Sequence, residues 1–140
     1  MSKVGFDFSE LEGLEHDLRR IAKHDGEIRK ASERVLNKLA KTVLAATKSN
    51  TPVRSGALRR NWQRTPVKVD VFRDEVSVKI YNITEYAPYV EYGHRIVVNG
   101  ITVGFADGVL MLTTAVKDAE KILPEMVEEQ IIAALERIGK

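Results

Sequence analysis

The spacing of apolar residues changes twice along this chain of 140 residues, and this change constrains the fold most strongly. Apolar residues recur every three or four positions over 9–21 and 25–49, which predicts helices. The spacing becomes two over 67–80, as in strands with one buried face, and helical spacing returns over 112–138. We therefore predict an α+β fold in one domain spanning residues 1–140, with N-terminal helices (one of them long), a small antiparallel sheet of about four strands, and a kinked C-terminal helix packed on the sheet.

Local signals indicate where these elements begin and end. A capping box at Ser9 begins the first helix, and Asp25-Gly26 either ends that helix or bends one continuous helix. Pro52 ends the long helix, because the residue before a proline avoids helical geometry. Because the apolar spacing continues across Pro124, we expect either one kinked C-terminal helix or two nearly collinear helices, without a change of direction.

Two antiparallel strand pairs are expected in the middle of the chain. The first covers 67–80 and turns at 73–74. The second covers 95–105 and turns at Asn99-Gly100, a strong signal for a two-residue hairpin turn. Within the segment 93–108 this second pair either extends the central sheet or becomes ordered only against a neighbouring subunit. Its exposed-looking apolar residues are Ile96, Val98, Ile101, Val103 and Phe105.

Composition indicates a soluble globular domain, with 44% hydrophobic and 30% charged residues. The chain has no cysteine, which excludes disulfides, thiolate metal ligands and cysteine nucleophiles. No apolar run approaches the roughly 20 residues of a membrane helix, and the N-terminal residues lack the apolar core of a signal peptide. We therefore expect a cytoplasmic or virion-type protein.

The charge is distributed unevenly although the net charge is only +2. No acid occurs over 34–69, where the local charge is +9, whereas acids exceed bases over 107–140. Such an asymmetry marks a surface that meets an anion, a self-complementary surface, or solvated helix faces.

No catalytic or metal-binding constellation is predicted. His16 and His24 are expected to be solvated on a helix face, and His94 stands alone after a glycine. The chain has no HExxH motif and no glycine-rich phosphate loop, and Ser55 is not part of a GxSxG motif. We therefore expect no catalytic residue, no metal, no cofactor and no enzymatic activity.

The first informative motif is the basic corner, residues 52–59, with the sequence Pro-Val-Arg-Ser-Gly-Ala-Leu-Arg. Its Ser-Gly pair permits a tight turn into a short helix, with Ser55 as candidate N-cap and Leu58 as apolar anchor. The corner either projects basic side chains from a rigid base or simply connects a helix to a strand. Its candidate functional residues are Pro52, Arg54, Ser55, Gly56, Leu58 and Arg59.

The second motif is the tyrosine box, residues 86–93, with the sequence Tyr-Ala-Pro-Tyr-Val-Glu-Tyr-Gly. Its tyrosines fall on one side of a short helix and form either an aromatic mini-core or a binding surface. Glu91 lies among apolar bulk and needs a partner. We predict that it pairs with an arginine of the basic corner or accepts hydrogen bonds from that corner's backbone. The candidate residues of the box are Tyr86, Ala87, Tyr89, Glu91, Tyr92 and Gly93.

The two motifs together resemble a known family. A corner of the form Pro-x-[Arg/Lys]-[Ser/Thr]-Gly-x-Leu-[Arg/Lys], followed about thirty residues later by Tyr-Ala-x-Tyr-Val-Glu-Tyr-Gly, looks like the small head–tail joining proteins of long-tailed bacteriophages and prophages. These are also described as tail-completion, neck or minor capsid-like proteins. The resemblance covers most of the chain, and His94 stands where family members often carry serine or threonine.

The resemblance implies a structural virion protein of the phage neck without catalytic residues. Such proteins form a ring, commonly sixfold, that joins the DNA-filled head to the tail tube around the DNA channel. The implied partners are further copies of the chain, a head connector or adaptor, and a tail-tube or tail-terminator protein. The implied location is the neck or tail of the virion, and the host cytoplasm during assembly. Candidate contacts to channel DNA or to a neighbouring subunit are Arg54, Arg59, Arg60 and Arg64.

An alternative hypothesis is a nucleic-acid-binding module that uses the basic stretch 34–68, with Trp62 and tyrosines as stacking surfaces. The total charge separates the two hypotheses, because a dedicated binder is usually strongly basic overall. The net charge of +2 and the acidic C-terminal helix favour the structural hypothesis.

Overall fold

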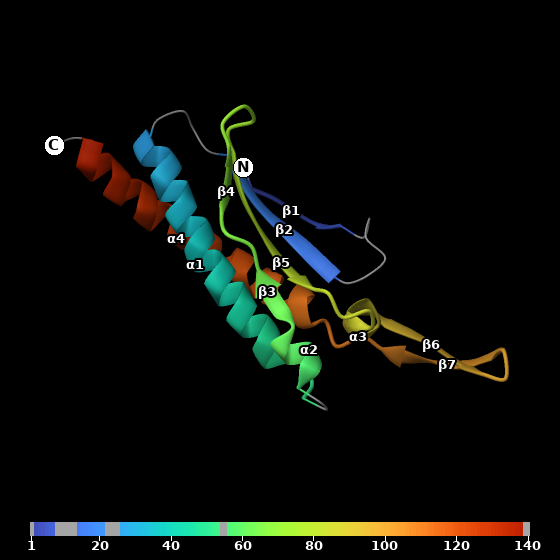
Figure 1. Ribbon diagram of the computed structural model, residues 1–140. Helices are drawn as coiled ribbons and strands as arrows, with labels where there is room; N and C mark the ends of the chain where they lie inside the picture. Colours follow the sequence, from blue (N-terminus) through green and yellow to red (C-terminus); the bar gives the residue numbers. More distant parts are fainter. Residues whose placement is uncertain (1, 8–13, 22–25, 54–55, 139–140) are drawn as a thin grey trace.

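A long helix lying against an antiparallel sheet organises the molecule (Figure 1). The structure is a computed structural model that describes residues 2–7, 14–21, 26–53 and 56–138. It confirms the predicted α+β class. In chain order the elements are β1 (Ser2–Asp7), β2 (Leu14–Ile21), α1 (Gly26–Asn50), α2 (Ala57–Arg60), β3 (Trp62–Arg64), β4 (Lys68–Asp70), β5 (Glu75–Asn82), α3 (Ala87–Tyr92), β6 (Gly93–Val98), β7 (Ile101–Asp107) and α4 (Met111–Ile138).

Strand β5 is the centre of the larger sheet. Strand β2 pairs along one side of β5, and β1 pairs with the outer side of β2. Strands β3 and β4 share the other side of β5, with Trp62 opposite Asn82 and Asp70 opposite Glu75. All of these pairs are antiparallel. The hairpin predicted over 67–80 is therefore confirmed as β4–β5, within a sheet of five strands.

One face of this sheet forms the core with α1. Val76, Val78 and Ile80 of β5 alternate inward and are almost fully buried. Helix α1 covers them with an apolar stripe at helical spacing, so the long helix predicted over 25–49 is confirmed. The buried residues of α1 are Ala31, Val35, Leu36, Leu39, Ala40, Val43 and Thr47.

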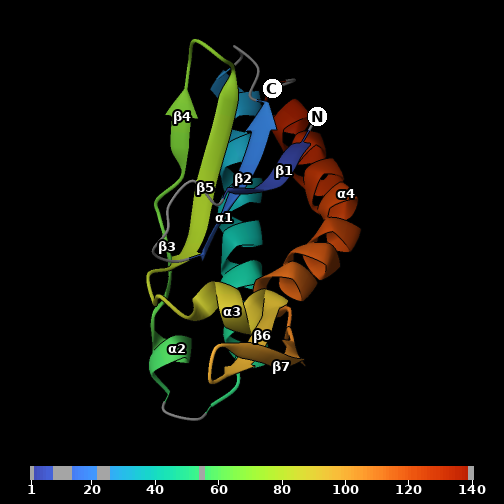
Figure 2. The ribbon, with the colours of Figure 1, turned by 90° about the vertical axis from the view of Figure 1, so that its right-hand side faces the viewer.

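Helix α4 packs beside α1 on the same side of the sheet (Figure 2). Arg34 Nε donates a hydrogen bond to Gln130 Oε1 at 2.9 Å, and Asn50 Nδ2 donates to the Met111 carbonyl oxygen at 3.1 Å. The helix continues through Pro124 and bends along its length, as predicted.

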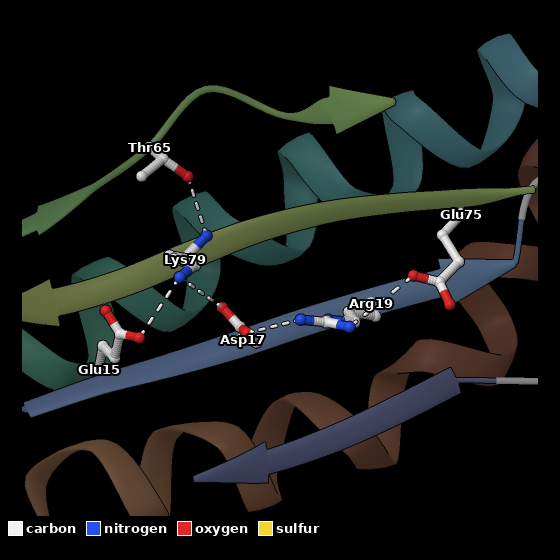
Figure 3. A network of polar contacts seen from close by, with 6 residues as sticks. All are labelled: Glu15, Asp17, Arg19, Thr65, Glu75 and Lys79. Carbon is white, nitrogen blue, oxygen red and sulfur yellow. Dashed lines mark hydrogen bonds and ion pairs between the residues drawn. The ribbon is translucent and has the colours of Figure 1, made fainter. Parts of the chain in front are cut away.

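The opposite face of the sheet is charged (Figure 3). Lys79 Nζ lies 3.3 Å from Glu15 Oε1 and 3.8 Å from Asp17 Oδ1. Arg19 connects Asp17 to Glu75, at 3.1 and 3.8 Å. Partly exposed ion pairs of this kind add little stability individually. They do make this face polar along β2 and β5.

The helix predicted over 9–21 is wrong, because Leu14–Ile21 is strand β2. Leu14, His16 and Leu18 are buried, whereas Glu15 and Asp17 point to the charged face. A period of two was therefore present, but the leucine spacing matched a helix equally well. The predicted solvation of His16 is also wrong, since its side chain is completely buried. The capping box at Ser9 and residue His24 lie outside the described residues.

The second predicted hairpin is present as β6–β7, but it does not extend the central sheet. Strands β6 and β7 pair with each other in a separate two-stranded sheet, which we call the ribbon. The ribbon projects away from the body of the molecule beyond α3 (Figure 1). The expectation of one small sheet is therefore corrected to a sheet of five strands and a ribbon of two.

Candidate assembly site

The acid of the tyrosine box is buried where α3, the ribbon and α4 meet. The Glu91 side chain is 0% exposed. Its Oε1 accepts a hydrogen bond from Leu112 N at 2.9 Å, and its Oε2 accepts from Thr113 N at 2.7 Å and Thr113 Oγ1 at 2.6 Å. These amides belong to the first turn of α4, where the helix dipole also favours a negative charge. Glu91 therefore caps α4 from a distant part of the chain.

The predicted partner of Glu91 is therefore wrong. The carboxylate does not pair with an arginine of the basic corner and does not accept from that corner's backbone in the part of the chain that the structure describes. Its burial among apolar groups requires hydrogen-bond donors, as expected, but the start of α4 supplies them. The same carboxylate influences its neighbour, because partial burial and the Glu91 charge raise the pKa of the Tyr92 hydroxyl.

Two glycines allow the chain to pass very close to itself at the base of the ribbon. Gly93 has a φ of 86°, and a Cβ added there would collide with the Ala106 carbonyl oxygen. A Cβ added to Gly108 would collide with the Glu91 carbonyl oxygen. Both positions therefore require glycine, which explains the glycine that ends the tyrosine box.

Backbone hydrogen bonds close the same region. Val109 N donates to the Val90 carbonyl oxygen at 2.8 Å, and Leu110 N donates to the Glu91 carbonyl oxygen at 3.1 Å. We call residues 90–93 and 108–113 the junction. It fixes the two ends of the ribbon to α3 and α4, so the direction of the ribbon is set by buried contacts.

Beyond the junction the ribbon exposes apolar side chains. Its turn has Asn99 and Gly100 at positive φ values of 51° and 78°, which confirms the predicted turn. Val98 pairs with Ile101, while Arg95 pairs with Phe105 on the other face, so neither face is wholly polar. Six apolar side chains are between 42% and 72% exposed: Ile96, Val97, Val98, Ile101, Val103 and Phe105.

The tyrosines of the box are exposed as well, so the mini-core interpretation is wrong. Tyr86, Tyr89 and Tyr92 are between 44% and 59% exposed, whereas Ala87 is fully buried beneath them. The Tyr89 ring meets the His94 ring edge-on, with 6.2 Å between centroids. A groove of about 510 Å³ lies between α3 and the ribbon. Its lining residues are Tyr86, Tyr89, Val90, His94, Arg95 and Val97.

The basic corner connects α1 to β3. Arg54 and Ser55 lie outside the described residues. Gly56 precedes α2 with a φ of 77°, and Leu58 is buried as the expected anchor, whereas Pro52 is exposed. The described part of the corner is thus a compact connection built around one apolar side chain.

Two of the candidate arginines are engaged within the chain. Arg59 Nε donates to the Lys48 carbonyl oxygen in the last turn of α1 at 2.8 Å. Arg64 Nη2 donates to Asn37 Oδ1 at 2.8 Å. Arg60 is exposed and is the better placed of the three described arginines to meet a partner.

The corner and the box lie at the same end of the molecule (Figures 1 and 2). Asn82 Nδ2 donates to the Leu58 carbonyl oxygen at 2.8 Å, and Asn61 Nδ2 donates to Thr84 Oγ1 at 3.0 Å. These two bonds tie the corner and the residue after α2 to the end of β5 and to the loop that leads into the box. Sequence reasoning missed these asparagines, although an asparagine at the inward position of β5 was a usable signal.

This arrangement defines the class of the protein by its fold: an α+β protein whose exposed apolar surface is carried on a ribbon anchored at both ends. Among the described residues, no group of three or more histidines, aspartates or glutamates could hold a metal ion. None of the described helices is long and apolar enough to cross a membrane.

A family comparison then identifies the chain. Residues 15–93 match the HK97-gp10-like family, described as "Bacteriophage HK97-gp10, putative tail-component". Because the match covers more than half of the chain, the protein belongs to this family and is a structural component associated with the phage tail. Neither a curated protein nor a solved structure matches the chain. The family is a structural one, which is consistent with a protein that is not an enzyme and is located in the virion.

Proposed function

We propose that this tail-associated protein forms a ring in the phage neck that joins the DNA-filled head to the tail tube. Its partners would be further copies of itself, with six as the expected number, a head connector or adaptor, and a tail-tube or tail-terminator protein. Membership of a phage tail family and the resemblance of the two motifs to head–tail joining proteins support this role.

The single observation that carries the proposal is the exposed ribbon. An isolated two-stranded hairpin is marginally stable in water unless it packs on something. Exposed apolar patches of this kind mark interaction sites in soluble proteins. The junction holds the ribbon in one direction through Glu91, Gly93 and Gly108, so the ribbon is presented as an arm for another protein.

The basic residues contribute a second, weaker contact. Lys38 and Lys41 are exposed on α1, and Arg60 and Lys68 are exposed near the β3–β4 edge. In a ring around DNA these side chains would attract the phosphate backbone without reading its sequence. Self-association of the isolated protein is expected to be weak and dependent on concentration and salt.

Shortening the ribbon tests the proposal. Deletion of 98–102 with a short replacement turn should leave the fold intact, because those residues lie outside the core. Phage carrying this deletion should accumulate separate heads and tails, counted by electron microscopy. The matched control is Asn99→Asp, which keeps a favourable hairpin turn and should yield normal virions. Normal virions from the deletion would contradict the proposal.

A further inference from the structure

A second apolar surface lies on the outer side of α4, from the middle of the helix to its C-terminal end. Ile122, Ile132 and Leu135 are 39%, 49% and 56% exposed. Leu123 and Ala134, by contrast, are buried against the core. At about 100° per residue the three exposed side chains lie within about 140° of one side of the helix. We call this side of the helix, over 122–136, the α4 outer face.

The α4 outer face is acidic. Glutamates are interleaved with the three apolar residues on the same side of the helix and are all exposed: Glu125, Glu128, Glu129 and Glu136. Arg137 is turned toward α1, where its Nη1 lies 4.0 Å from Glu27. Lys121, at the other end of the stripe, lies 3.7 Å from Asp118 Oδ1. The stripe therefore combines apolar contact area with an excess of negative charge.

The part of the ribbon beyond its base has the opposite character. No acidic residue occurs over 94–106, whereas Arg95 is exposed beside the apolar residues of β6. The acid of β7, Asp107, lies at the base of the ribbon, opposite Gly93. The outer part of the ribbon and the α4 outer face therefore match in kind, apolar against apolar, and Arg95 carries a charge opposite to that of the glutamates. Complementary charges of this sort select a partner and fix its register.

The two surfaces cannot meet within one chain. The ribbon extends from one end of the molecule, and the C-terminal half of α4 lies at the opposite end, in both views (Figures 1 and 2). A contact between them must therefore join different copies. Because the two surfaces differ, a copy that uses each surface with a different neighbour makes a head-to-tail contact, and repetition of that contact produces a ring or a filament. A reciprocal pair, in which each ribbon packs on α4 of the other copy, would instead stop at a dimer.

We propose that the ribbon of one copy packs on the α4 outer face of the next copy, with Val98 and Ile101 against Ile132 and Leu135. This contact rests on the proposed function only in requiring that copies of the chain meet. The proposed contact identifies the surface on which the ribbon packs, and it explains why α4 carries exposed isoleucines among glutamates.

Crosslinking tests the contact directly, because the chain has no cysteine of its own. The double variant Val98→Cys/Ile132→Cys, treated with a short bis-maleimide, should give a ladder of multimers on a denaturing gel. The two positions are similarly exposed, at 52% and 49%, so both thiols are accessible. Val98→Cys/Phe72→Cys is the matched control, because Phe72 is 100% exposed at the β4–β5 turn, and it should give no ladder.

Three results would overturn the contact. They are the absence of a ladder from Val98→Cys/Ile132→Cys, a stronger ladder from the Phe72 control, and dimers from Val98→Cys alone, which would mean that ribbons pair with each other. Wild-type rings seen by native mass spectrometry alongside any of these results would leave the neck function standing and remove only this contact.

Charge reversal gives a second measurement. Arg95→Glu in the Val98→Cys/Ile132→Cys background should strongly reduce the ladder, because it places an acid against the acidic stripe. Arg73→Glu reverses an exposed arginine at the other end of the molecule and should have little effect. Equal effects of the two reversals would contradict the charge pairing.

Discussion

The β4–β5 and β6–β7 hairpins have similar alternating sequences, but the core covers apolar side chains of the first and leaves those of the second exposed. Both alternate β-branched residues around a tight turn, and both have the antiparallel pairing that the sequence predicts. Ile80 in β5 is fully buried under α1, whereas Ile101 in the ribbon is 67% exposed. Local pattern therefore specifies a hairpin, and tertiary neighbours decide whether its apolar residues are covered. Residues that a chain leaves uncovered on a fixed arm are available to a partner.

The most direct test of this difference is to truncate an isoleucine in each hairpin and to compare the losses of stability. Ile80→Ala should lower the free energy of unfolding by about 4 kcal/mol, because it opens a cavity in a packed core. Ile101→Ala should change it by no more than about 0.5 kcal/mol, because nothing in the free subunit covers that side chain. Urea denaturation measures both values. Similar losses from the two substitutions would mean that the ribbon contributes to the stability of the isolated fold.

Acid should weaken the sheet through His16, which is paired with Ile80 across β2 and β5. Burial lowers the pKa of His16 from 6.5 to about 4, and the nearby Asp17 opposes this shift only in part. In the unfolded chain His16 therefore binds a proton below about pH 6.5, whereas in the folded chain it stays neutral down to about pH 4. The contribution of His16 to the free energy of unfolding is fully present above about pH 6.5, and about 3 kcal/mol of it is lost as the pH drops to about 4.

The measurement is urea unfolding at a series of pH values between 7 and 4. His16→Met replaces the ring with an apolar side chain that cannot titrate, so this variant should lose most of the pH dependence over that window. A variant that keeps the wild-type slope would assign the acid sensitivity to other groups.

The junction, which joins the two regions compared, should show the smallest of the three stability effects. Glu91→Ala removes the cap of α4 and leaves buried amides without an acceptor, for a loss of about 2 kcal/mol. Thermal unfolding checks this loss. Glu91→Gln keeps one acceptor and should lose less, and Glu85→Ala, which removes an exposed acid before α3, should have little effect. An unchanged melting temperature in Glu91→Ala would contradict the capping role.

The sequence predicted those features that depend on neighbours in the chain. The extent of α1, the turn at Asn99-Gly100 and the continuous α4 were all predicted correctly, because periodicity and turn chemistry are local. Strand β2 was missed because Leu14 and Leu18 fit a helical spacing and a strand spacing equally well. Pairing with β5, more than fifty residues away, decides between them.

In the candidate site, too, the sequence predicted only those features that depend on neighbours in the chain. The apolar surroundings of Glu91 in the sequence predict that it needs hydrogen-bond donors. The donors are amides of α4, which the fold brings against α3, and no local sequence pattern predicts that contact. Gly108 was missed as a partner of Gly93 for the same reason. The exposure of the tyrosines depends on what does not cover them, and a single sequence carries no signal for that. The apolar residues of the ribbon did look exposed in the sequence, but whether the hairpin joins the central sheet was left open, because that depends on distant neighbours.

Hydrogen–deuterium exchange on the free subunit and on the assembled particle tests the central claim most directly. Amides of 98–102 in the ribbon should exchange quickly in the free protein and slowly after assembly, because the ribbon then lies against a neighbour. Amides of 76–80 in β5 should be protected in both states, since they are buried in the core sheet. Ribbon amides that exchange equally fast before and after assembly would contradict the account.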